Sequence, residues 1–322
     1  MPERYPAIDP FQHGLLEVDH GNRLYWEVAG SAEGKPALVL HGGPGSGCQP
    51  WHRQMFDPAA YRVVLFDQRG CGRSSPHAGD PGTSLEGNDL GHQLADIEAL
   101  RELLGIDRWL VWGGSFGCDL ALAYAERHPQ RVTEMVLWGV TTASRAEEDW
   151  LFRGGAAAFF PQQWQRLLDA MPEADRGGDP VEAYSRLLES TDADVRHRAA
   201  EAWCLWESAT PDWPPREGLA ERYRDPRFAL AFARLVTHYV RHHHFLEDGQ
   251  LLRDVGQLAE IPAVLVQGRF DFQSPPAAAW NLSRAWPAAE LVMVGDGGHG
   301  PGSGAMTAQL VAATDRFAGV AD

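Results

Sequence analysis

Short apolar runs alternate with segments of helical spacing along most of the chain. Buried-strand patterns occur at residues 35–40, 62–66, 109–112, 132–140, 263–268 and 290–294, and helical patterns at 85–104, 276–286, 305–317 and in the segment that ends at 128. The opening segments 14–18 and 23–29 alternate apolar and polar residues around a turn at 19–22, which predicts an antiparallel hairpin. Strands that alternate with helices at short intervals predict an α/β fold with a mostly parallel, doubly wound sheet.

This rhythm is interrupted in the second half of the chain. Residues 146–247 contain no apolar strand pattern, only helix-like stretches broken by Gly and Pro clusters at 176–180 and 211–215. We therefore expect an α/β core domain made of residues 1–145 and 248–322, with an inserted helical cap domain at 146–247. Such a cap would cover the carboxyl ends of the strands and shield a site there from water.

A serine stands between two glycines where a strand pattern gives way directly to a helical one. The sequence Gly113-x-Ser115-x-Gly117 is typical of a nucleophile elbow, a strained turn that holds a serine hydroxyl clear of the sheet at the start of a helix. Glycine is needed on both sides because a Cβ would crowd the neighbouring strand and helix. An ordinary turn between a strand and a helix is the alternative interpretation.

A nucleophilic serine needs a base, and the base needs an orienting carboxylate, in the chain order serine, acid, histidine. Of the thirteen histidines, only His299 follows the last strand pattern. Asp271 follows the preceding strand, whereas Asp254 comes before that strand and Asp296 is close to the histidine, so both are weaker choices. We expect Ser115, Asp271 and His299 to form a catalytic triad that acts through an acyl-enzyme.

The same positions weigh against other functions of the fold. Haloalkane or epoxide hydrolysis would need an aspartate at the elbow, where this chain has Ser115. A non-catalytic binding protein would be indicated by a missing triad member, and none is missing.

Two loops after strands carry further candidate residues. The Gly-rich loop 41–45 brings backbone N–H groups close to a ligand, so we expect the N–H groups of Gly43 and Phe116 to form an oxyanion hole. A phosphate-binding loop is disfavoured because no Gly-Lys-Ser/Thr follows. Asp67 and Arg69 lie among glycines after the next strand, and we expect them to hold that loop rather than contact substrate.

Composition and charge limit the classes of partner and the cellular location that we expect. A net charge of −16 without any basic stripe argues against nucleic acid and anionic membrane. The four cysteines form no C-x-x-C pair, which gives no zinc signature and favours a reducing compartment. The chain starts without signal-peptide features and has no apolar run of membrane-spanning length, so we expect a cytoplasmic protein.

A run of three histidines, 242–244, raises the question of a metal site. Consecutive helical residues point about 100° apart, so three adjacent imidazoles do not easily share one ion. Partly protonated histidines at the end of a cap helix are the favoured interpretation, since they suit the C-terminal end of the helix dipole. No metal or cofactor is expected.

Several segments together resemble the proline iminopeptidase (prolyl aminopeptidase) family of α/β-hydrolases. They are residues 42–45, 67–74, 112–117, 202–207, 238–239, 245–247 and 268–271, so the resemblance covers nearly the whole chain. It implies a serine peptidase without metal or cofactor that removes an N-terminal residue, preferably proline, from small peptides. It also implies the triad and oxyanion roles given above, and it implies that Glu207 pairs with the amino group of the substrate.

The departures from the family pattern gather where specificity should reside. Val236 stands where we expect a second glutamate for the substrate's amine, Thr141 where a phenylalanine walls the proline ring, and Ser274 where cysteine is usual. The elbow itself carries Phe116 for tryptophan and a Cys-Asp pair at 118–119 for Ser-Thr. Losing one of two carboxylates around a buried ammonium could cost several kcal/mol.

Two other residues are candidates for the pocket. His244 replaces a glycine common in the family, and we expect it at the pocket rim. Trp206, next to Glu207, is a candidate contact to the substrate.

Two hypotheses therefore compete for the substrate. An aminopeptidase would bind the free amine with Glu207 alone, whereas a hydrolase of esters or acylated amides, such as a secondary-metabolite intermediate, would need no free amine. Whole-chain similarity favours the first hypothesis and the missing carboxylate favours the second. The oligomeric state is not determined by the sequence.

Overall fold

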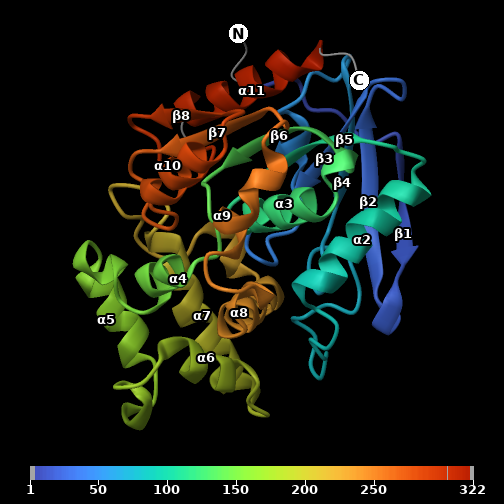
Figure 1. The fold of residues 1–322 in the computed structure, drawn as a ribbon. Coiled ribbons are helices and arrows are strands. Elements are labelled where there is room, and N and C mark those ends of the chain that lie inside the picture. The colour runs from blue at the N-terminus through green and yellow to red at the C-terminus, as the bar shows by residue number, and fades with distance from the viewer. Residues whose placement is uncertain (1–3, 303, 320–322) are drawn as a thin grey trace.

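The computed structural model describes residues 4–302 and 304–319, and an eight-stranded sheet forms its centre (Figure 1). The strands are β1 (Gln12–Glu17), β2 (Arg23–Gly30), β3 (Lys35–Leu40), β4 (Tyr61–Phe66), β5 (Trp109–Gly114), β6 (Val132–Trp138), β7 (Ala263–Gly268) and β8 (Ala289–Val294). Their order is β1-β2-β4-β3-β5-β6-β7-β8. β1 and β2 are antiparallel to their neighbours and all other pairs are parallel, which confirms the predicted mostly parallel α/β sheet.

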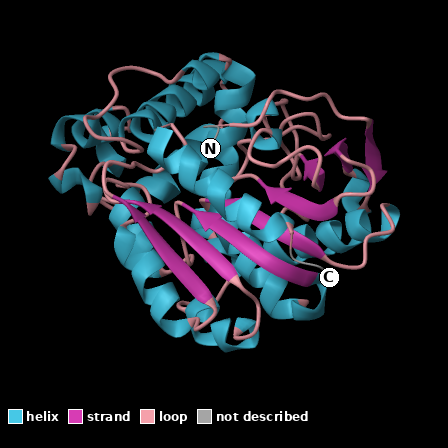
Figure 2. Cartoon of the chain, turned by 90° about the horizontal axis from the view of Figure 1, so that it is seen from above, coloured by secondary structure: helices cyan, strands magenta, loops and turns pink. Residues whose placement is uncertain are grey.

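Helices cover both faces of this sheet (Figure 2). Alternation along β3 divides its side chains between two cores: Leu38 and Leu40 pack with α2 (Leu90–Leu103) and α3 (Phe116–Arg127), and Ala37 and Val39 pack on the face of α11 (Gly304–Ala318). A parallel sheet buried on both faces requires such continuous apolar strands. Two further helices flank the sheet, α1 (Pro50–Arg53) and α10 (Pro276–Ala285).

Several predicted elements differ from the observed ones by one or more residues at their ends, and two of these differences have a clear local cause. The helix expected at 85–104 starts at Leu90, because the Asp89 side chain accepts a hydrogen bond from the His92 N–H at 3.0 Å and caps the helix. The strand expected at 132–140 ends at Trp138, because Gly139 adopts φ +53° and turns the chain away from the sheet.

Helices fill the segment between β6 and β7. They are α4 (Arg145–Phe152), α5 (Pro161–Asp169), α6 (Pro180–Leu188), α7 (Ala193–Ala209), α8 (Pro226–Arg241) and α9 (Gln250–Asp254). Figure 1 shows α4 to α8 below the sheet, on the side of its carboxyl ends. The first five share an apolar cluster around Tyr184, Trp203 and Phe232 that is separate from both sheet cores. Treating residues 146–247 as a distinct cap domain stays a prediction.

Candidate active site

Ser115 occupies a strained turn between the central strand β5 and helix α3. Its backbone has φ +55° and ψ −128°, and the turn is fixed by its N–H, which donates to Trp138 O at 3.0 Å, and by its carbonyl, which accepts from Cys118 N–H at 2.7 Å. A non-glycine residue in a sparsely populated conformation costs about 1–3 kcal/mol and persists only where the surroundings enforce it.

The two flanking glycines are required by close backbone approach. A Cβ on Gly113 would lie 2.4 Å from the carbonyl oxygen of Gly117, and a Cβ on Gly117 would lie 2.2 Å from that of Leu40. No side chain fits at either place, so the sequence pattern around Ser115 has a steric cause.

His299 and Asp271 form a buried pair on the loops after β8 and β7. The His299 Nδ1 lies 3.0 Å from each carboxylate oxygen of Asp271. Burial alone would lower the pKa of His299, but the charge and hydrogen bonds of Asp271 outweigh it and raise that pKa. Because Nδ1 faces the carboxylate, Nε2 is the nitrogen left to exchange a proton with a substrate or nucleophile.

Asp271 is itself held by three donors. Its Oδ1 accepts from the N–H groups of Ser274 at 2.7 Å and Gln273 at 3.0 Å, and its Oδ2 accepts from Gln267 Nε2 at 2.9 Å. Ser274, expected in the substrate pocket, therefore also positions the carboxylate through its backbone.

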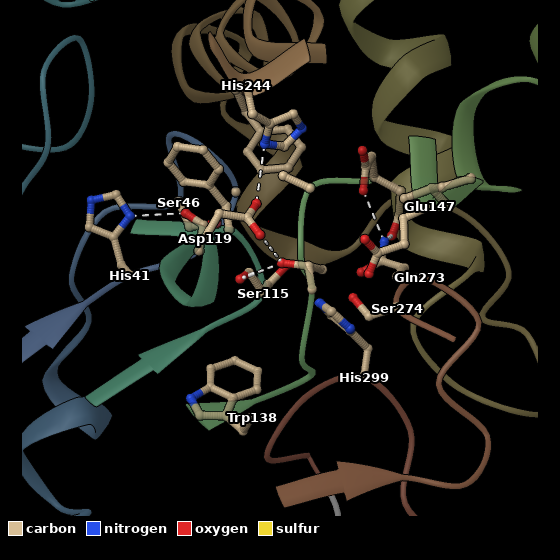
Figure 3. Close-up of a pocket in the computed structure, with 18 of the residues that line it drawn as sticks. His41, Ser46, Ser115, Asp119, Trp138, Glu147, His244, Gln273, Ser274 and His299 are labelled. Atoms are coloured by element: carbon tan, nitrogen blue, oxygen red, sulfur yellow. Dashed lines mark hydrogen bonds and ion pairs between the residues drawn. The ribbon is translucent and has the colours of Figure 1, made fainter. Parts of the chain in front are cut away.

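Ser115 and His299 line the same cavity, and Figure 3 shows the His299 ring directed toward Ser115. Within residues 4–302 and 304–319, no hydrogen bond joins the Ser115 hydroxyl to that ring, which is common in enzymes without substrate. The backbone N–H of His299 donates to the carbonyl oxygen of Pro211 at 2.6 Å, so the loop after α7 holds the loop that carries His299.

The predicted oxyanion donors line the same cavity as Ser115. Gly43 adopts φ +118°, and a Cβ there would lie 2.6 Å from the Gly45 nitrogen, so only glycine fits. Phe116 is the first residue of α3, where an N–H has no partner inside the helix and the helix dipole favours negative charge. Both residues line the cavity.

Asp67 and Arg69 hold the loop after β4, as expected. Asp67 accepts from Cys48 N–H and Arg73 Nε at 2.7 Å each, and Arg69 pairs with Asp96 through two contacts of 2.6 Å. Neither side chain lines the cavity.

The cavity has a volume of about 360 Å³ and is lined both by loops at the carboxyl ends of the strands and by the helical segment between β6 and β7. Its polar lining comprises His41, Ser46, Gln49, His52, Ser115, Asp119, Thr141, Ser144, Glu147, Glu148, Glu207, Arg222, His244, Gln273, Ser274 and His299. Four carboxylates stand against one arginine in this set, so the cavity suits a small substrate that carries a positive charge.

Glu207, on α7, is one of the buried carboxylates of this lining. Burial raises its pKa to about 7, although Arg222 and His299 oppose the shift by their charge. Its Oε2 accepts from Gln273 Nε2 at 2.9 Å. A buried carboxylate without a full salt bridge gains most from a cationic partner.

Glu147 and Glu148 enter the cavity from the first turn of α4. Glu147 accepts from the N–H and hydroxyl groups of Ser144 at 2.8 Å each, which completes a capping box, and burial raises its pKa. Glu148 accepts from Arg153 at 3.4 Å through Oε2, while its buried Oε1 has no hydrogen-bond partner among the described residues. Burial raises the pKa of Glu148, with nearby cations opposing.

Comparisons with known proteins agree with this fold. The family model of the alpha/beta hydrolase fold matches residues 35–302. The chain is 51% identical over 318 residues to a probable proline iminopeptidase of Streptomyces coelicolor, covering 98% of this chain and 97% of that protein. It is 46% identical to a proline iminopeptidase of Xylella fastidiosa, covering 98% of this chain and all of that protein. The chain belongs to the proline iminopeptidase family.

Solved structures extend the likeness to the fold alone. A bromoperoxidase from Bacillus anthracis superposes with a TM-score of 0.65 at 18% identity, covering 95% of this chain and 98% of that one. The esterase RhEst1 from Rhodococcus sp. superposes with a TM-score of 0.59 at 22% identity, covering 95% and 98%. At such identities the shared architecture carries no statement about substrate.

Two positions expected in the pocket of this family member lie outside it. Trp206 is 1% exposed, packs in the cap core and donates from Nε1 to Leu151 O at 3.1 Å, so its ring points away from the cavity that Glu207 lines. Val236, on α8, is also 1% exposed and belongs to the same core. We expected these two side chains to lie in the substrate pocket, and the structure places both in the apolar core of the helical segment instead.

The histidine run serves three separate contacts. His242 Nδ1 lies 2.8 Å from His238 O, His243 Nδ1 lies 2.9 Å from Glu148 Oε2, and His244 Nδ1 lies 3.1 Å from Asp119 Oδ2. Their different partners confirm that the three rings are not gathered around one point. Only His244 lines the cavity.

Several cavity residues escaped prediction from the sequence. Glu147 and Glu148 follow Ser144 in a capping-box pattern, so their sequence signal indicates a helix start and not a site. Arg222 and Gln273 lie in irregular segments without a motif. Asp119 is one of the departures from the family pattern near the elbow. Its position four residues after Ser115, on the helix that starts there, is the sequence signal that could have placed it near the nucleophile.

Proposed function

We propose that this protein is a serine aminopeptidase that removes an N-terminal residue, proline foremost, from small peptides or amides. One observation carries the proposal: Ser115 on its strained turn shares one cavity with His299, which is paired with Asp271, and with the buried carboxylate of Glu207. The names of the relatives, proline iminopeptidase, support the same activity.

The proposed chemistry has two steps. Ser115 attacks the substrate carbonyl while His299 takes its proton through Nε2, and Asp271 holds the imidazole and stabilises the imidazolium. The N–H groups of Gly43 and Phe116 bind the oxyanion. His299 then protonates the leaving amine, and a water molecule activated by the same histidine releases the acyl group from Ser115.

Glu207 is proposed to bind the protonated amine of the substrate. Although position 236 is a valine, Glu207 is not the only carboxylate of the cavity, because Asp119, Glu147 and Glu148 line it as well. The argument from a missing carboxylate therefore loses weight, and a free-amine substrate is favoured over an ester or an acylated amide.

The test compares specificity constants for proline arylamide, alanine arylamide, N-acetylproline arylamide and a short acyl ester, with Ser115→Ala as the blank. The proposal expects the free-amine proline substrate to lead clearly. Activity on the acetylated amide or the ester alone would overturn it and would assign the scaffold to another acyl substrate.

Location and partners complete the proposal. Among the described residues, no helix is both long and apolar enough to cross a bilayer. A cytoplasmic location remains a prediction, supported by four buried cysteines that are all free. The proposed partner is a small peptide or amide substrate. No metal or cofactor enters the proposed chemistry.

A further inference from the structure

Arg222 is the one arginine among the described residues that line the cavity. It belongs to the single-turn helix Glu221–Arg224, which lies between α7 and α8 in the chain. Arg222 is exposed to solvent, whereas the carboxylates of Asp119, Glu148 and Glu207 are buried. The cavity therefore presents buried negative charge and a single guanidinium that solvent reaches.

The guanidinium of Arg222 is held in place without being neutralised. Its Cζ lies 4.6 Å from the centre of the Tyr223 ring and 5.4 Å from that of Phe232. Nη2 donates to the Tyr223 hydroxyl at 2.6 Å, and Nη1 donates to Ser46 Oγ at 3.4 Å. Among the described residues, no carboxylate forms an ion pair with Arg222. A guanidinium carries more N–H donors than these contacts use, so Arg222 can still bind an anionic group.

The contact with Ser46 places Arg222 next to the predicted oxyanion loop. The Ser46 N–H donates to the Gly42 carbonyl oxygen at 3.1 Å, which closes the turn that contains Gly43. A Cβ on Gly42 would lie 3.1 Å from the Ser115 Cβ, so this turn passes directly beside the nucleophile. Ser46 and Ser115 both line the cavity (Figure 3).

This position suits the residue that leaves when the peptide bond is cleaved. In the proposed mechanism, the attacked carbonyl lies between Ser115 and the Gly43 N–H. Consecutive Cα atoms of a peptide are about 3.8 Å apart, so the C-terminal carboxylate of a dipeptide lies within one residue of that carbonyl. A cation beside the oxyanion loop is therefore within reach of the carboxylate.

We propose that Arg222 binds the C-terminal carboxylate of the substrate, and that the preferred substrates are free dipeptides with N-terminal proline. Glu207 holds the protonated amine, Arg222 holds the carboxylate, and Ser115 attacks the peptide bond between them. Arginine suits this role because its planar guanidinium can donate two parallel hydrogen bonds to one carboxylate. This inference rests on the proposed aminopeptidase function.

The remaining charge of the cavity works against a substrate carboxylate. Asp119, Glu147, Glu148 and Glu207 line the same cavity and repel it. A preference for the free dipeptide over its uncharged amide therefore needs a local cation. Without Arg222, the amide should become the equal or the better substrate.

The test compares prolylalanine with prolylalaninamide by the release of free proline. The two compounds share the proline residue and the scissile bond, and they differ only in the charge at the C-terminus. We expect the wild-type ratio of kcat/KM to favour the free dipeptide by roughly fivefold, the upper range for an ion pair that solvent reaches.

Arg222→Met removes the charge and keeps an unbranched apolar side chain over the two aromatic rings. The dipeptide to amide ratio should fall by roughly fivefold, to one or below. Any loss that affects folding or cap position acts on both compounds and cancels in the ratio. Arg224→Met is the matched control, because Arg224 is exposed on the same short helix but lies outside the cavity lining. That control should keep the wild-type ratio.

The outcomes separate this inference from the proposed function. A wild-type ratio of one or less, or a ratio that Arg222→Met changes by less than about twofold, overturns recognition of the carboxylate by Arg222 and leaves the aminopeptidase function intact. An equal fall in Arg224→Met would show an effect of net charge and would also overturn it. Release of proline from neither compound, with hydrolysis of the short acyl ester, overturns the proposed function itself.

Discussion

The sheet edge and the cap contribute opposite walls of one cavity, and they hold their residues by different means. On the sheet edge, Ser115 and Gly43 are fixed by backbone geometry at strand ends, with close contacts that exclude other residues. On the cap side, Glu207 projects from α7, which packs around a separate core, and His244 projects from the short turn after α8. Their orientation depends on helix packing and on single contacts to Gln273 and Asp119.

This difference assigns separate tasks to the two walls. Acyl transfer needs a nucleophile, a base and oxyanion donors held within fractions of an ångström, and strand ends supply that rigidity. Recognition of the first residue needs only a few polar groups, which helices can exchange without disturbing the sheet. Sequence changes that alter substrate specificity are therefore expected on the cap side and in the loops that contact the cap.

The largest expected effect comes from the sheet edge. Ser115→Ala should reduce kcat on proline arylamide by roughly 10⁴-fold or more, because no other group replaces the nucleophile. Steady-state kinetics measures the loss, and an unchanged melting temperature controls for folding. Turnover close to the wild-type rate would show that Ser115 is not the nucleophile.

Glu207→Gln tests the cap side. The variant should lose roughly 10²-fold or more in kcat/KM for free-amine substrates, since a charged partner of the ammonium is removed. It should keep its activity on a short acyl ester, which serves as the matched control. An equal loss on both substrates would assign Glu207 to the chemistry instead of to amine recognition.

The pH dependence sharpens this assignment. Because burial raises the pKa of Glu207 to about 7, the ionised form that binds ammonium grows as the pH rises through 7. The free-amine to ester ratio of kcat/KM should rise over the same interval in the wild type. In Glu207→Gln the free-amine to ester ratio of kcat/KM should stay flat. The ionisation of His299 does not affect this ratio, because both substrates need its neutral form.

The same carboxylate should oppose stability at alkaline pH. Its folded pKa lies above the unfolded value near 4.5, so the folded state binds more protons between about pH 4.5 and 7 and stability is lost as the pH rises through that window. Glu207→Gln should therefore gain on the wild type by up to about 3 kcal/mol from pH 5 to pH 8. Chemical denaturation at both pH values measures it, and an equal difference at both would contradict the shift.

Val236→Glu tests whether the cap core can accept the carboxylate expected from the family. Val236 is buried among apolar side chains, so an added charge should lower stability by about 3 kcal/mol or more and should not raise activity on proline arylamide. Val236→Leu is the apolar control. Higher proline activity in the glutamate variant would place this position in the substrate pocket.

The smallest effect is expected at Trp206. Trp206→Phe keeps an aromatic ring in the cap core and removes the hydrogen bond to Leu151 O, so stability should fall by about 1 kcal/mol. The proline to alanine ratio of kcat/KM should change by less than about twofold, since the ring does not reach the cavity. A large change in that ratio would return Trp206 to the substrate pocket.

The order of strands and helices could be predicted from the sequence alone, and so could Ser115, Asp271 and His299 as candidate catalytic residues. This was possible because these features are local: period-two and helical spacing report burial, and glycines flank the elbow where a Cβ would collide with backbone. The remaining features depend on tertiary packing. Whether Trp206 or Glu207 faces the cavity, and that Asp119, Thr141 and His244 meet, depends on how cap helices far apart in sequence pack over the sheet. The local sequence does not report such packing. Adjacent residues of a helix point in different directions, and helical spacing alone does not show which of them faces a core and which faces a cavity.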